Sequence, residues 1–419
     1  MRTIWIRLSL FCLLITAATG VLMRSFAFIS LPQLDYGHLL HAHSHTALLG
    51  WGYSALFLLI AALFFHNDVR ESLQLRILFW STQAAIAGMF ISFTVQGYGL
   101  FSIACSTIHI LLSYWFGIFV WRQLKRDGNS NAGASLSSKF LKGSLLCLFL
   151  SSLGPWMLAI LSANQLKGSA WYDVAIYFYL HFQYNGWFML GLIAVLFRLL
   201  EQKGIRFPIK LANVQFALYA ASLLPSFLLS VLWLELNPFW HAAAASGAVL
   251  QWVAVMILIL IVIRTRASMA TLFRGWSGIF AVLAFLALFM KATMEIGSAI
   301  PGLSELIYAS RSIVIGYLHL TLLGFVSFLC LALFLQQGWL EDRSRGARIG
   351  YMCFLTGFCV NELVLFVNGL LEWTSSGRFS YGDQLLLIAS GAMTVGILLF
   401  TVRIRGKAGN HPGEMQSNK

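Results

Sequence analysis

Residues 39–65 read LLHAHSHTALLGWGYSALFLLIAALFF, a long apolar run with three histidines near its start. About 20 consecutive apolar residues are enough for a helix to cross the hydrocarbon core of a bilayer. The run therefore predicts a membrane-spanning helix. Ionisable residues inside such a helix are rare and usually functional, so His41, His43 and His45 are candidates for a site.

Comparable runs follow one another along almost the whole chain. Hydrophobic residues make up 59% of the 419 residues and charged residues only 10%, against about 25% charged residues in soluble proteins. We therefore predict an all-α integral membrane protein of twelve spans, with a single transmembrane domain over residues 1–403 and a disordered cytoplasmic tail over residues 404–419. The predicted spans are residues 5–29, 39–65, 76–99, 102–122, 140–162, 174–198, 211–235, 240–263, 276–297, 307–335, 349–371 and 381–402.

Basic residues are concentrated in alternate loops, which are those of Arg2 and Arg7; Arg70 and Arg76; Arg122, Lys125, Arg126, Lys139 and Lys142; Arg198, Lys203, Arg206 and Lys210; Arg264, Arg266 and Arg274; Arg343, Arg345 and Arg348; and Arg403, Arg405 and Lys407. The positive-inside rule places these loops and both termini in the cytoplasm, as an even number of spans requires. The net charge of +13 is thus explained by topology, and no nucleic-acid partner is expected. We predict a multi-pass protein of a bacterial-type inner (cytoplasmic) membrane, with the lipid bilayer as its main partner.

A short pattern occurs three times: histidine, four residues, glycine and an aromatic residue. The copies are residues 45–51 (HTALLGW), 181–187 (HFQYNGW) and 319–325 (HLTLLGF). They fall on the second, sixth and tenth predicted spans, at steps of 136 and 138 residues. This spacing predicts three repeated four-helix units, a construction common in membrane proteins. The glycine lies well round the helix from its histidine, so we expect it to admit a neighbouring helix.

Histidines within the predicted spans occur only on even-numbered spans, in the half nearer the outside. On span two, His38, His41 and His45 share one helix face and His43 points away from it. We predict cofactor ligands at His45, His181 and His319, and metal ligands at His41, His109, His181 and His241. For His43, His109 and His241 the alternative is a hydrogen-bonded polar group between helices.

The surroundings of these histidines favour haem. Two imidazoles on facing helices in an apolar bundle are the usual ligands of a b-type haem. Imidazole also suits copper and zinc, but no neighbouring carboxylate or thiolate favours zinc. The six cysteines form no CxxC or CxxCH pattern, which argues against a covalently attached c-type haem and a zinc knuckle. We therefore predict haem b, with copper as a further candidate cofactor.

In this arrangement the chain resembles subunit I of the haem–copper oxidases and nitric oxide reductases. The resemblance rests on twelve spans with both termini inside, on three four-helix units, and on histidines in spans two, six and ten. It covers nearly the whole chain. It implies that His45 and His319 hold a low-spin haem, that His181 binds copper, and that a cytochrome or a quinol is the redox partner.

The chain departs from that family at the gas-reducing centre. Span seven has no histidine where the family has an adjacent pair, Tyr317 stands where a histidine ligates the catalytic haem, and Asn185 replaces a tyrosine or glutamate. The low-spin haem is thus expected to persist, while an oxidoreductase activity stays open. Residues 41–45 (HAHSH), with the glycine that follows, also resemble the NnrS family of haem- and copper-containing membrane proteins associated with nitric oxide stress.

Further polar residues inside predicted spans are Lys291, Glu295, Arg311, Asn361 and Glu362. Lys291 and Glu295 are four residues apart, which predicts an ion pair; a proton route from the cytoplasm is the alternative. Arg311 is expected either to meet a haem propionate or to extend to the membrane surface.

These observations predict a haem-binding membrane redox protein that acts in electron transfer, or in the chemistry or sensing of O₂ or NO. The alternative is a transporter of a metal ion or small solute that uses the intramembrane histidines, because repeats and buried polar residues are also typical of transporters.

Overall fold

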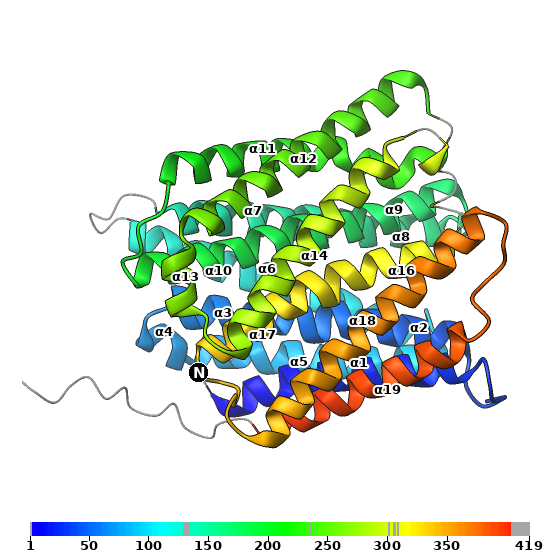
Figure 1. Cartoon of the computed structure of the whole chain (residues 1–419), viewed down its shortest axis with the longest axis horizontal. Helices are drawn as coiled ribbons and strands as arrows, with labels where there is room; N and C mark the ends of the chain where they lie inside the picture. Colours follow the sequence, from blue (N-terminus) through cyan, green and yellow to red (C-terminus); the bar gives the residue numbers. More distant parts are fainter. Residues whose placement is uncertain are drawn as a thin grey trace, which may run out of the picture.

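The computed structural model describes residues 2–128, 135–234, 236–300, 302–304, 307 and 310–403. Within these ranges, twelve helical segments are long and apolar enough to cross a membrane, which confirms the predicted fold class and the number of spans. They lie alongside one another in one bundle (Figure 1). The predicted tail, residues 404–419, lies outside the described residues.

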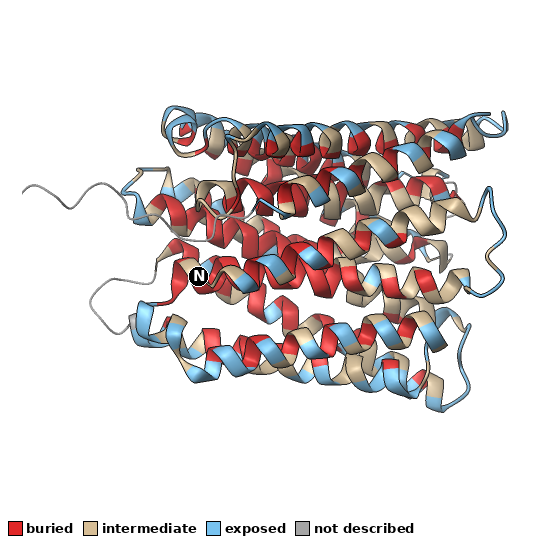
Figure 2. Cartoon of the chain, turned by 90° about the horizontal axis from the view of Figure 1, so that it is seen from below, coloured by how far each residue is buried: buried red, intermediate tan, exposed pale blue. Residues whose placement is uncertain are grey.

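Three spans are composite and share one construction. An α-helix ends at the motif histidine, a π-helix with wider turns follows, and a second α-helix continues across the bundle. They are α2 (Tyr36–His45), η1 (Thr46–Tyr53) and α3 (Ser54–Phe64); α9 (Ala170–His181), η2 (Phe182–Phe188) and α10 (Met189–Gln202); and α16 (Arg311–His319), η4 (Leu320–Ser327) and α17 (Phe328–Gln336). The three composite spans are the most deeply buried ones, as the red ribbons of Figure 2 show.

Nine further spans surround these three. They are α1 (Thr3–Ser25), α5 (Leu73–Gln96), α6 (Leu100–Gly128), α7 (Leu136–Ser151) with α8 (Leu153–Ala163), α11 (Ile209–Phe227) with the 3-10 helix η3 (Leu228–Leu234), α12 (Pro238–Arg264), α14 (Trp276–Ser298), α18 (Arg345–Trp373) and α19 (Gly382–Thr401). Gly97 has φ +58° and makes the tight turn that separates α5 from α6. Pro225 lies in the last turn of α11, where a proline interrupts regular helix hydrogen bonding.

Polar side chains cap several of the helix starts. Asp35 accepts the backbone N–H of His38 at the start of α2, and Ser310 accepts that of Ile313 at the start of α16. Such caps satisfy N–H groups that have no partner within the helix. Because both caps lie at the first residues of spans that carry motif histidines, they also fix where these spans begin.

The basic loops gather at one end of the bundle. The short helices α4 (Asn67–Glu71) and α13 (Arg266–Leu272) belong to two of these loops, and both lie at the end where Figure 1 marks the N-terminus. Arg2 reaches across this end to Glu71, with 3.4 Å between Nη2 and Oε2. The cytoplasmic assignment of this end remains a prediction from the charge distribution.

The glycine of each repeated motif packs against the first helix of its own four-helix unit. A Cβ added to Gly50 would lie 3.2 Å from Cβ of Cys12 on α1, and one on Gly324 would lie 2.9 Å from Cβ of Ala287 on α14. At Gly186 the added Cβ would collide with Cys147 on α7. The missing side chain thus admits a neighbouring helix, as the motif predicted, and it does so equivalently in all three units.

Adding a methyl group at this contact is expected to destabilise the protein. Gly186→Ala forces Cys147 and the helix α7 away from η2, and overpacking of this kind costs roughly 1–3 kcal/mol. Gly391→Ala in α19 is the control, because a Cβ there meets nothing within 4 Å. Thermal unfolding in detergent measures both variants. Equal stability of the two would contradict the close contact between the helices.

The two halves of the central spans differ in character. The segments α3, α10 and α17, toward the N-terminal end, are apolar and almost completely buried, whereas α2, α9 and α16 carry the histidines and are buried less completely (Figure 2). The histidines of the repeated motif therefore lie in the half of the bundle that is predicted to be nearer the outside.

Candidate functional site

His43 lies on α2 and faces α1. Its Nδ1 is 2.9 Å from the carbonyl oxygen of Thr16 and 3.2 Å from the hydroxyl of Thr19. Since a carbonyl oxygen only accepts hydrogen bonds, Nδ1 carries the proton and Nε2 keeps its lone pair. The ring edge lies over Gly20, where an added Cβ would be 3.4 Å from Cε1. His43 is thus fixed in the tautomer that a metal ligand needs.

His319 ends α16 and faces α18. Its Nδ1 lies 3.1 Å from the amide nitrogen of Asn361 and 3.6 Å from Oε1 of Glu362. The same amide nitrogen donates to Oε1 of Glu362 at 3.0 Å, so Nδ1 of His319 accepts its hydrogen bond in this arrangement. A proton on Nδ1 requires that the Asn361 amide turn its oxygen toward the ring. The side chain of His319 keeps 25% of its surface exposed, while that of Glu362 keeps 8%.

His43 and His319 lie near enough for their imidazoles to interact electrostatically, with α1 behind His43 and α18 behind His319. In each ring Nδ1 faces a helix that packs behind it, and Nε2 has no hydrogen-bond partner among the described residues. Histidines that bind a metal are typically oriented in this way, with the second nitrogen held by a carbonyl or a carboxylate. We call these residues the His43–His319 pair.

The sequence predicted a different partner for His319. It paired His319 with His45, because these two residues occupy equivalent positions of the repeated motif. The structure places His45 against Phe93 on α5, and it brings His43 within electrostatic range of His319. Two residues along an α-helix differ by roughly 200° in direction, so His43 and His45 must face different spaces. The geometry therefore favours His43 as the partner of His319.

Two arginines, Arg24 and Arg311, lie near the His43–His319 pair, at the end of the bundle predicted to face the outside. Arg311, the first residue of α16, donates from Nη2 to the hydroxyl of Tyr36 at 3.2 Å. Its Cζ also lies 5.5 Å from the centroid of the Tyr36 ring. Arg24, in the last turn of α1, interacts electrostatically with Arg311, Tyr36, Asp383 and His43. Two neighbouring guanidinium groups in this position suit a ligand with carboxylate groups.

His45 faces α5, on the opposite side of α2. Its Nδ1 donates to the carbonyl oxygen of His41 at 2.9 Å, and its ring stacks on Phe93 with 4.2 Å between centroids. The ring of His41 lies 4.5 Å from that of Tyr98 in an edge-on contact. His45 also interacts electrostatically with His109. His41 and His45 thus share one face of α2, as predicted, and this face packs against aromatic side chains.

His109 on α6 is enclosed by aromatic residues. It is 2% exposed, and its ring meets the ring of Tyr53 edge-on at 5.0 Å. Its Nδ1 lies 3.4 Å from the hydroxyl of Ser113, and its Nε2 is buried and unpaired within the described part of the chain. His45, predicted as a haem ligand, interacts electrostatically with both His109 and His41, and these side chains form no group of three metal ligands within the described residues.

The third motif histidine, His181, uses both ring nitrogens within the protein. Its Nε2 donates to the carbonyl oxygen of Leu223 at 2.8 Å, and its Nδ1 accepts from the amide of Asn185 at 3.2 Å. His181 is 2% exposed. No lone pair remains for a metal ion in this arrangement, so the structure gives no support to the copper ligand that the sequence predicted here.

His241 lies apart from the other predicted ligands. It is in the first turn of α12, half-buried, and its Nδ1 is buried without a partner in the described residues. Over the described ranges, no group of three or more histidine, cysteine, aspartate or glutamate side chains is arranged to hold a metal ion. A site with two protein ligands, such as a haem site, is the arrangement that these histidines can form.

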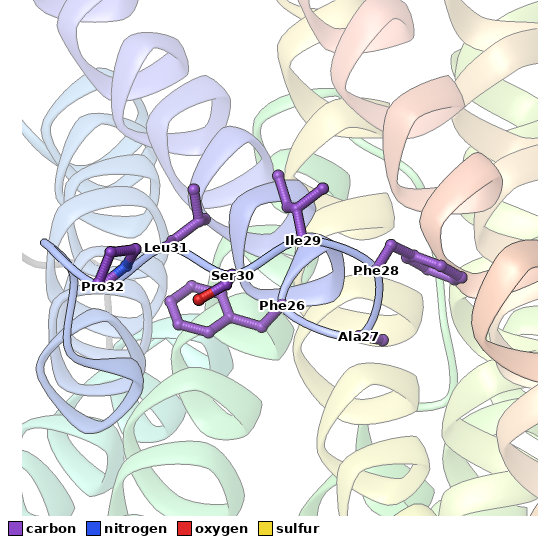
Figure 3. A pocket seen from close by; sticks show the side chains of 7 residues that line it. All are labelled: Phe26, Ala27, Phe28, Ile29, Ser30, Leu31 and Pro32. Carbon is purple, nitrogen blue, oxygen red and sulfur yellow. The ribbon is translucent and has the colours of Figure 1, made fainter.

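The surface hollow in Figure 3 is unrelated to the histidines. It lies on the loop after α1 and is lined by seven consecutive residues, 26–32. Their side chains are apolar except for Ser30, and none of them is titratable. The hollow therefore offers no group for redox or metal chemistry.

No protein-family model and no curated protein matches the chain. The site is consequently defined by its own geometry. Sequence reasoning identified His319, Arg311, Asn361 and Glu362 as polar residues within spans, but it did not connect them with His43. The sequence contains one indication of a separate role for His43, which is that it lies on a different face of the helix from His45.

Proposed function

We propose that this chain is a haem-binding integral membrane redox protein in which His43 and His319 would hold a b-type haem. The observation that carries the proposal is the His43–His319 pair: two imidazoles within electrostatic range of each other, each held at Nδ1 by a neighbouring helix and each without a hydrogen bond at Nε2. When bound, a bis-histidine haem supplies a one-electron change at its iron. The protein side chains set how firmly the haem is held and at what potential it works.

The groups behind the two ligands have separate tasks. The Thr16 carbonyl fixes the ring orientation of His43, so that its Nε2 points away from α1. Asn361 and Glu362 do the same for His319 from α18. A carboxylate beside Nδ1 also makes the imidazole a stronger electron donor. Glu362 is therefore placed to stabilise the oxidised state of an iron bound to His319.

Arg24 and Arg311 fit the other end of a haem. A b-type haem carries two propionate groups, and two guanidinium groups near the His43–His319 pair can neutralise them through charge-assisted hydrogen bonds. Arg311 is already oriented by Tyr36. Arg24 and Arg311 would thus hold the carboxylates of a bound haem at the end predicted to lie nearer the outside, where a cytochrome or a quinol would deliver electrons.

The proposed haem site corresponds to one site of subunit I of the haem–copper oxidases and nitric oxide reductases, the low-spin haem. Both ligands lie on spans two and ten, as that family's low-spin haem requires, and the three composite spans support the repeated construction. The helix-two ligand is His43 in this proposal. Copper at His181 is not part of it, because both nitrogens of that ring are engaged.

Transport of a metal ion or solute has less support. A translocation path needs polar groups through the whole thickness of the bundle. The segments α3, α10 and α17 instead bring closely packed apolar side chains together in the half that contains the N-terminus. The histidines are therefore closed off from that end.

An absorption spectrum of the purified protein tests the proposal. After expression with added haem precursor, we expect a Soret band, sharp low-spin bands on reduction, and a pyridine haemochrome of the b type in a one-to-one ratio with the chain. A monodisperse protein that carries no Soret band would overturn the proposal.

Glu362→Gln is expected to raise the midpoint potential of this haem. The change removes a negative charge next to His319 and so stabilises the oxidised iron less. Glu372→Gln is the matched control on the same helix, since Glu372 pairs with Arg378 and Ser310 at the outer end of α18. A redox titration measures both variants. A potential that moves equally in both would show that Glu362 has no specific role.

A further inference from the structure

A second polar cluster lies between α9, α12, α14 and α16, on the other side of α16 from the His43–His319 pair. At its centre, Nζ of Lys291 lies 2.7 Å from Oε1 of Glu295. Lys291 is 3% exposed and Glu295 is 7% exposed. The ammonium group also lies 5.6 Å from the ring of Tyr317 and 6.0 Å from that of Tyr184. A carboxylate and two aromatic rings thus surround a cation that belongs to the chain itself.

The carboxylate of Glu295 is fully used. Besides Lys291, its Oε1 accepts a hydrogen bond from the Tyr317 hydroxyl at 2.7 Å, and its Oε2 accepts one from the side-chain amide of Gln251 at 2.7 Å. Gln251 in turn accepts from the hydroxyl of Ser226 at 3.0 Å. Three helices, α12, α14 and α16, are therefore tied to one carboxylate.

His181 completes the wall of this cluster. It interacts electrostatically with both Glu295 and Lys291, and its two nitrogens bond to Leu223 and Asn185. Every side chain here that could ligate a metal ion already has its partners. A divalent cation would also meet the positive charge of Lys291, and like charges repel strongly where water is excluded.

We propose that Lys291 is a built-in cation that takes the place of a second metal ion, so that this cluster binds no metal in the native protein. The cluster then lacks the second metal ion that the paired metal centre of a gas reductase would need. The inference rests on the proposed function only where it refers to a haem. The cluster itself lies apart from the proposed haem ligands.

Metal content per chain tests the inference. Purified wild-type protein, Lys291→Met and the double variant Lys291→Met/Glu295→Gln are incubated with excess Zn²⁺, dialysed, and analysed for zinc by mass spectrometry. Wild type is expected to retain no more zinc than His181→Ala does. Lys291→Met leaves the Glu295 carboxylate without its counter-ion and open to an added cation, and it is expected to retain more zinc than wild type, whereas the double variant is expected to behave as wild type.

Two results would overturn the inference. One is wild-type protein that retains stoichiometric zinc, or copper in a parallel experiment, and loses it on His181→Ala. The other is equal zinc retention by Lys291→Met and the double variant. If Lys291→Met does not fold, the zinc content of the wild-type protein and of His181→Ala still tests the inference. The Soret band of the same samples reports the haem separately, so failure of the haem proposal is distinguished from failure of this one.

Discussion

His319→Ala is expected to abolish the low-spin haem spectrum and to reduce the haem retained after purification by more than about tenfold. Removal of groups that merely orient a ligand typically costs 10–100-fold in affinity, and removal of the ligand itself must cost at least as much. His319 has its Nδ1 at Asn361 and its Nε2 free, so no neighbouring side chain can replace it. Absorption spectra and the pyridine haemochrome give the haem content.

His181→Ala is the matched control for this experiment. His181 occupies the equivalent position of the same repeated motif, also directly before a π-helix. Its nitrogens bond to Leu223 and Asn185, so we expect its loss to leave the spectrum unchanged. If both variants lose haem to the same extent, the loss reflects damage to the fold, and the assignment of His319 as a ligand fails.

Glu295→Ala is expected to destabilise the protein by about 3–5 kcal/mol, because it leaves the buried ammonium of Lys291 without its counter-ion. The variant also leaves the hydroxyl of Tyr317 and the amide of Gln251 without their acceptor. Unfolding followed in detergent, by heat or by denaturant, measures the loss.

The double variant Lys291→Met/Glu295→Leu is the control for the unpaired charge. It removes both charges at once, and replacing a buried ion pair by apolar residues is often neutral. We therefore expect it to be clearly more stable than Glu295→Ala. A double variant as unstable as Glu295→Ala would show that the pair itself, and not the unpaired charge, controls stability.

The spans and the repeat could be predicted because both leave direct marks in the sequence. Apolar runs of span length and basic residues in alternate loops define the twelve spans. The histidine and glycine of residues 45–51 recur at a constant step. The glycine contacts with α1, α7 and α14 follow from the same pattern, since a missing side chain in a membrane helix usually admits a neighbour.

The partner of His319 could not be predicted, because it depends on how the helices are rotated within the bundle. The motif singled out His45, whose position is equivalent to that of His319. In the structure His45 packs against Phe93 on α5, whereas His43, two positions earlier, lies within electrostatic range of His319. Sequence periodicity shows that the two histidines lie on different faces of α2, but it does not show which face meets α16.

Only part of the Lys291 cluster could be predicted, because most of its contacts join different helices. The pairing of Lys291 with Glu295 follows from their spacing of four residues on one helix, and the structure confirms it. Tyr317 and Gln251 come from two other helices, and nothing in their sequence neighbourhoods connects them with Glu295. Contacts between distant segments become visible only in the folded bundle.

The most direct test of the central claim exchanges one candidate ligand for another on α2. His43→Met and His45→Met each introduce a thioether, and replacing one histidine ligand by methionine raises the potential of a haem iron. We predict that His43→Met raises the midpoint potential measured by redox titration, while His45→Met leaves it unchanged. A rise in His45→Met with no change in His43→Met would contradict the His43–His319 pair.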